Sequence, residues 1–99
     1  MTPLRVLLHA PTAEALARAR RNASNLLDAR PDAEVLIIAN AGAVGAALAT
    51  PDASDPLLRV CRNSLTAQRL DNDRGLAEVE AAVVTLAEHQ AQGWSYIRA

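Results

Sequence analysis

Short apolar runs alternate along the chain with longer segments whose apolar positions recur at helical spacing. Five runs are short enough to be strands: residues 4–9 (LRVLLH), 33–39 (AEVLIIA), 57–61 (LLRVC), 76–79 and 94–97. Residues 35–38 of the second run are all apolar, and a strand that is apolar on both faces belongs in a parallel sheet covered on both sides. We therefore expect residues 35–39 to form the central strand.

The segments between these runs predict helices at residues 13–29, 43–49, 64–70 and 80–92. Thr12 is of the type that caps a helix N-terminus, and Gly93 stands where a glycine ends the last helix. Residues 50–56 contain two prolines and two aspartates and are expected to be a loop. Strands that alternate with helices predict an α/β sandwich with a mainly parallel sheet of about five strands. Helices 13–29 and 80–92 should flank it, within one domain over residues 1–99.

The composition is that of an ordinary globular domain, with 51% apolar and 21% charged residues. The net charge is −1, so the chain lacks the basic excess that attracts a polyanion, and we expect no nucleic-acid partner. The chain has no lysine, and its ten cationic side chains are all arginine. This excludes chemistry that needs a lysine, such as a Schiff base or a Walker A loop.

The first apolar run is interrupted by Arg5 and is too short for a signal peptide or a membrane span, so we expect no membrane association. The chain has one cysteine, which cannot form a disulfide within the chain. A reducing, cytoplasmic setting fits this cysteine usage best.

Cys61, in VCRNSL at residues 60–65, is the candidate for covalent chemistry. A free thiol is often a small buried apolar group, and that interpretation stays open. A reactive thiol is favoured by position, because ligands of open α/β sheets bind beyond the carboxyl ends of the strands and Cys61 ends one. The backbone of the turn at Asn63 and Ser64, with Arg59 and Arg62 nearby, would favour the thiolate. We therefore expect a partly exposed Cys61 with a lowered pKa.

His9 ends the first strand, at the same edge of the sheet as Cys61 if the two strands are parallel. It could be a base for the thiol, a polar residue that lines the site, or a histidine satisfied by the turn at Pro11 and Thr12. Cys61, His9 and His89 lack the spacing of zinc ligands, so we expect no metal site. We also expect no cofactor, because the glycines at positions 42 and 45 do not complete a phosphate-binding loop.

Three segments together resemble the DsrE/DsrF-like family, and more narrowly its small single-domain branch. They are residues 9–27 (HAPTAEALARARRNASNLL), 60–65 (VCRNSL) and 89–99 (HQAQGWSYIRA). The branch has a cysteine and a small polar turn after a middle strand. It ends in Gln-x-x-Gly-Trp-x-Tyr-Ile, matched here by Gln90, Gly93, Trp94, Tyr96 and Ile97. The chain departs from this pattern at residues 71–74 (DNDR), where a more apolar stretch is expected.

The resemblance implies a three-layer α/β/α sandwich and a homo-oligomer, either a trimer or a hexamer. Extra burial between subunits would also help a chain of this size. Some members of the family carry sulfane sulfur as a cysteine persulfide, whereas others lack the cysteine and act as structural subunits. Asn25 and the terminal residues Gln90, Gly93, Trp94 and Tyr96 are expected to serve the fold or the contacts between subunits.

Two hypotheses for the function follow. In the first, the protein is a sulfur carrier or is similar to a sulfurtransferase. Cys61 then forms a persulfide, His9, Arg62, Asn63 and Ser64 line the site, and sulfur is exchanged with a donor or acceptor protein. In the second, the protein is a non-catalytic oligomeric binding or scaffold protein in which Cys61 only packs.

Overall fold

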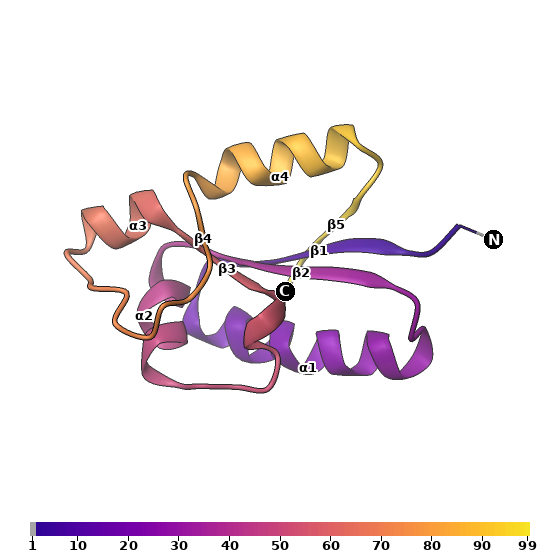
Figure 1. Ribbon diagram of the computed structural model, residues 1–99, viewed down its shortest axis with the longest axis horizontal. Helices are drawn as coiled ribbons and strands as arrows, with labels where there is room; N and C mark the ends of the chain where they lie inside the picture. Colours follow the sequence, from indigo (N-terminus) through magenta and orange to yellow (C-terminus); the bar gives the residue numbers. More distant parts are fainter. Residues whose placement is uncertain (1) are drawn as a thin grey trace.

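Five parallel strands form one sheet in the computed structural model of the protein, which describes residues 2–99 (Figure 1). They are β1 (Arg5–Ala10), β2 (Glu34–Ala39), β3 (Leu58–Cys61), β4 (Glu78–Val79) and β5 (Ser95–Arg98). The strand order is β4-β3-β2-β1-β5, so the run that is apolar on both faces is the central strand, as predicted. Every neighbouring pair is parallel, which confirms the predicted fold class.

The helices are α1 (Ala13–Ala29), α2 (Gly42–Ala49), α3 (Arg62–Ala67) and α4 (Ala82–Ala91), with a short 3₁₀ turn, η1 (Asp55–Leu57). Figure 1 shows α1 and α2 on one face of the sheet and α4 on the other, which gives the three layers. Thr12 caps α1 as predicted, because its Oγ1 accepts the N–H of Ala15 at 3.0 Å. Gly93 follows α4 with a φ of +94°, a conformation that favours glycine. No helix within residues 2–99 is long and apolar enough to span a bilayer.

The two faces of the sheet are covered to different extents. Toward α1 and α2, side chains such as Leu8, Ile37 and Val60 belong to a large continuous core. Toward α4, the buried cluster has only five members, which are Leu7, Ile38, Cys61, Ala82 and Leu86. Because side chains alternate between the faces of a strand, His9 also lies on this α4 side of the sheet. The α4 side therefore leaves polar side chains at the ends of the strands near the surface.

The boundaries differ from the prediction in the second half of the chain. The fourth strand covers only Glu78 and Val79. The side chain of Asn72 uses the backbone groups of Leu76, because its NH₂ donates to the Leu76 carbonyl and its Oδ1 accepts the Leu76 N–H, so Leu76 does not join the strand. The helix expected at residues 64–70 begins at Arg62 and ends at Ala67. The expected loop at 50–56 includes the start of η1.

Asp55 fixes the connection between α2 and β3. Its carboxylate accepts hydrogen bonds from the guanidinium groups of Arg20 in α1, at 3.3 Å, and of Arg74 in the loop before β4. The side chain of Asp55 is only 16% exposed, and its second oxygen also accepts the N–H of Asp52. One carboxylate thus joins three segments that are far apart in the sequence.

Candidate functional site

Cys61 ends β3 and stands at the N-cap position of α3, on the α4 side of the sheet. Its Sγ accepts the backbone N–H of Ala82, the first residue of α4, at 3.4 Å. The residue is 5% exposed, so the expectation of a partly exposed thiol is wrong. The start of α4 packs against the sulfur, and this contact between residues 21 positions apart could not be read from the local sequence.

The pKa of Cys61 is nevertheless lowered, as predicted. Burial raises the pKa of the thiol, but hydrogen-bond donors around the sulfur outweigh that effect. In decreasing order they are the N–H of Ala82, the hydroxyl of Ser64, and the N–H groups of Ser64 and Asn63. Of these contacts, the one from Ala82 has good hydrogen-bond geometry, and the others act on the sulfur more weakly. The net effect is a thiol pKa below its ordinary value.

The two arginines expected to support the thiolate are engaged elsewhere. The guanidinium group of Arg59 donates to the backbone oxygens of Pro56 and Leu58 at 3.1 and 2.9 Å. Arg62 donates from Nε to Glu78 Oε1 at 3.0 Å. The pKa of Glu78 is lowered by hydrogen bonds from the side chains of Asn72 and Arg62. The lowered pKa of Cys61 therefore depends on uncharged donors.

Ser64 links the cysteine to a strained turn. Its Oγ accepts the N–H of Ala41 at 3.0 Å, which leaves its O–H free to donate to the sulfur. Ala41 has a φ of +49° and a ψ of −129°, which is unfavourable for any residue with a side chain. The side-chain amide of Gln68 holds the same residue by donating to the Ala41 carbonyl at 2.8 Å. Ala41 in the turn after β2 is thus held by Ser64 in α3 and by Gln68, the residue that follows α3.

His9 lies at the carboxyl edge of the parallel sheet, as expected, but its partners differ from the turn at Pro11 and Thr12. Its Nδ1 lies 2.6 Å from the hydroxyl of Tyr96, and its Nε2 lies 3.0 Å from Oδ1 of Asn40. Asn40 was not among the site residues predicted from the sequence. The missed signal was its position, because it is the first polar residue after the central strand.

The rest of the terminal motif supports the fold. Trp94 packs against the small cluster under α4, with its ring edge-on to His89 at 5.0 Å between centroids and the guanidinium of Arg5 at 5.8 Å from its centroid. The side-chain amide of Gln90 donates to the Leu86 carbonyl within α4 at 3.1 Å. Asn25 lies exposed on α1 and does not join the residues around Cys61.

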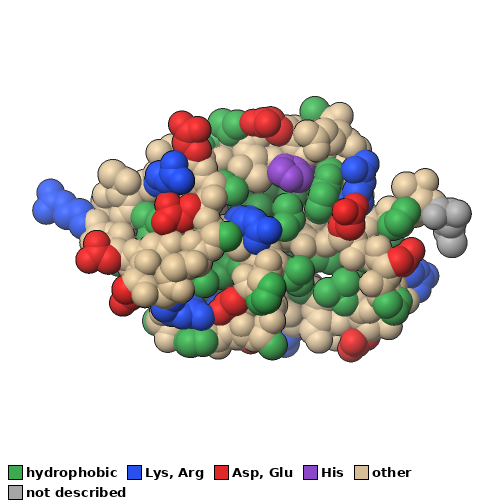
Figure 2. All heavy atoms as spheres, viewed as in Figure 1, with side chains coloured by type: hydrophobic (Ala, Val, Ile, Leu, Met, Phe, Trp, Pro, Cys, Tyr) green, Lys and Arg blue, Asp and Glu red, His purple; other side chains and the backbone are tan. Residues whose placement is uncertain are grey.

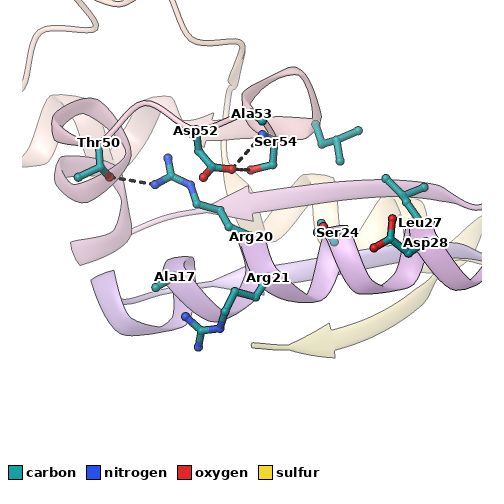
Figure 3. Close-up of a pocket in the computed structure, with 12 residues that line it drawn as sticks. Ala17, Arg20, Arg21, Ser24, Leu27, Asp28, Thr50, Asp52, Ala53 and Ser54 are labelled. Atoms are coloured by element: carbon teal, nitrogen blue, oxygen red, sulfur yellow. Dashed lines mark hydrogen bonds between the residues drawn. The ribbon is translucent and has the colours of Figure 1, made fainter.

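A groove lies away from Cys61, between α1 and the loop before β3 (Figure 3). Its volume is about 780 Å³, and Leu27 and Leu57 contribute apolar lining. Arg20 crosses it to donate to Thr50 at 2.9 Å. Opposite charges line the groove, since Arg20 and Arg21 are accompanied by Asp28 and Asp52, so it has no clear preference for a charged ligand.

The surface has no patch of one charge over the face drawn in Figure 2, where acidic and basic side chains are interspersed. Within residues 2–99, no three histidine, cysteine, aspartate or glutamate side chains are grouped so that they could hold a metal ion. Neither observation points to a polyanion or a metal as the ligand.

Comparison with known proteins gives a structural relative. No family model matches the chain, and no curated protein matches it. Among solved structures, the chain is similar to MTH1491 from Methanobacterium thermoautotrophicum, a protein of unknown function. The TM-score is 0.80 at 22% sequence identity, and the match covers 97% of this chain and 99% of that chain. This likeness shows a shared fold over nearly the whole chain.

Proposed function

We propose that the protein is a DsrE/DsrF-like sulfur carrier of the reducing cytoplasm, in which Cys61 holds sulfane sulfur as a persulfide. The observation that carries the proposal is the set of donors around Sγ: the N–H of Ala82 at 3.4 Å, supplemented by Ser64 and Asn63. A thiolate is the nucleophile in sulfur transfer, and neutral N–H and O–H donors stabilise it without an ion pair that would block the sulfur.

The reaction is an exchange between sulfur atoms. The Cys61 thiolate attacks the outer sulfur of a donor persulfide, R–S–SH. A new S–S bond forms to Sγ while the donor's S–S bond breaks, and the electron pair leaves with the thiolate R–S⁻. The products are Cys61–S–SH and R–S⁻, so no external oxidant or reductant is needed. Attack on the outer sulfur by an acceptor thiolate completes the transfer.

Intact-mass measurement after exposure to inorganic polysulfide tests this function. We expect wild-type protein to gain sulfur that a reductant removes, and Cys61→Ser to gain none. The serine variant is a matched control because it changes one atom at a buried position. Wild-type protein that takes up no more sulfur than Cys61→Ser would contradict the proposal.

The scaffold hypothesis is favoured by one observation, which is the 5% exposure of Cys61. If the thiol only packs, it should be alkylated by iodoacetamide only after denaturant is added. If it carries sulfur, the folded protein should be alkylated near neutral pH. The two functions therefore predict opposite results for the same measurement.

We also propose a homo-oligomer, a trimer or a hexamer. Apolar side chains that are 41–72% exposed in the single chain support this proposal: Val83 and Val84 on α4, and Tyr96 and Ile97 on the edge strand β5. Light scattering during size-exclusion chromatography should give a multiple of 10.5 kDa at micromolar concentration. A mass of one chain would refute the proposal.

A further inference from the structure

Asn40 occupies the position beside Cys61 at the carboxyl ends of the strands. The register of β2 and β3 pairs Ala39 with Val60. Asn40 and Cys61 are the next residues on these two neighbouring segments, so they lie side by side. Neighbouring strands of a sheet lie about 4.8 Å apart. Side chains alternate between faces, and Asn40 shares the α4 side with Ile38, as Cys61 does. Asn40 is therefore placed to meet a group bound to the sulfur.

The side-chain amide of Asn40 is oriented by its neighbours. Its Oδ1 can only accept a hydrogen bond, so Nε2 of His9, 3.0 Å away, must be the donor. In a neutral imidazole, Nδ1 of His9 then accepts the O–H of Tyr96 at 2.6 Å. Because Oδ1 accepts this hydrogen bond from His9, the orientation of the amide is fixed, and its NH₂ group remains available as a donor. It has no hydrogen-bond partner among residues 2–99.

We propose that Asn40 is a catalytic residue of the sulfur transfer, with an NH₂ group that donates to the outer sulfur bound at Cys61, and that His9 and Tyr96 are its positioning residues. This inference rests on the proposed function, since the donor has no target unless Cys61 carries sulfur. The outer sulfur lies about 2.0 Å beyond Sγ, while the neighbouring strand is about 4.8 Å away.

Two sets of hydrogen-bond donors would then stabilise negative charge on different sulfur atoms. During transfer, negative charge spreads from Sγ onto the sulfur under attack and the leaving sulfur. Ala82 and Ser64 act on Sγ, whereas Asn40 is not among the groups that lower the pKa of the thiol. A donor fixed in advance toward the atom where charge develops accelerates a reaction without changing the resting thiol. This difference separates a catalytic role from a structural one.

The test compares Asn40→Ala with wild type and with Asn22→Ala, a matched substitution at an exposed position on α1. The rate of sulfur uptake from inorganic polysulfide is followed by intact mass, and the rate of iodoacetamide alkylation is measured against pH. We expect Asn40→Ala to slow uptake about tenfold and to leave the alkylation midpoint unchanged. Asn22→Ala should match wild type in both measurements.

Tyr96→Phe provides a second test that removes one hydroxyl from an exposed side chain. It should slow uptake several-fold by loosening His9, again with an unchanged alkylation midpoint. Uptake within twofold of wild type in both variants, or equal losses of uptake and alkylation, would overturn the role of Asn40 and leave the sulfur-carrier function standing. If wild type itself takes up no sulfur, both proposals fall.

Discussion

Replacing Asp55 with alanine is expected to lower the free energy of unfolding by about 2–3 kcal/mol. The substitution leaves the guanidinium groups of Arg20 and Arg74 largely buried without their carboxylate. Removal of one partner from a buried ion pair is more destabilising than loss of an exposed pair, because the remaining charge stays desolvated. The expected value lies below the range for a fully buried pair because Arg74 is 25% exposed.

Urea unfolding followed by circular dichroism measures this effect, with Asp32→Ala as the control. Asp32 is exposed and forms no ion pair within residues 2–99, so its replacement should change the free energy of unfolding by at most about 0.5 kcal/mol. A loss below about 1 kcal/mol for Asp55→Ala would show that the three segments are held mainly by other contacts.

Ser64→Ala is expected to raise the pKa of Cys61 and to slow alkylation of the folded protein roughly tenfold below the thiol midpoint, since it removes a donor to a charged sulfur. The sign follows from the lowered pKa: between the folded value and the ordinary one, the native thiol is ionised while the unfolded thiol is protonated. In that interval the unfolded state binds more protons, so stability rises with pH and falls as pH drops through the folded pKa. Loss of the Ser64 hydroxyl raises the folded pKa of Cys61 toward its ordinary value, so this pH interval becomes narrower.

The measurement is the rate of iodoacetamide labelling of the native protein against pH, with Thr66→Ala as a matched loss of a hydroxyl on the exposed part of α3. Thr66→Ala should keep the wild-type midpoint. A Ser64→Ala midpoint equal to that of wild type would mean that the backbone N–H donors alone set the pKa of Cys61. A downward shift would contradict the assigned role of the hydroxyl.

The sequence by itself determined the layers of the fold. Consecutive apolar residues in β2 require cover on both faces, and that requirement made β2 the central strand. Thr12 and Gly93 marked helix ends because capping depends on backbone groups a few residues away. Cys61 was placed at a strand end because the apolar run at residues 57–61 ends there.

Only the tertiary structure decided what surrounds Cys61. The donor from Ala82 comes from a helix 21 positions later, and the orientation of Asn40 depends on His9 and Tyr96, which are 87 positions apart. Asp55 likewise read as a loop aspartate until Arg20 and Arg74 were brought to it. Apolar periodicity records which face of an element is buried, but it carries no information on which polar groups meet there. Those meetings depend on strand order and on how helices pack across the sheet.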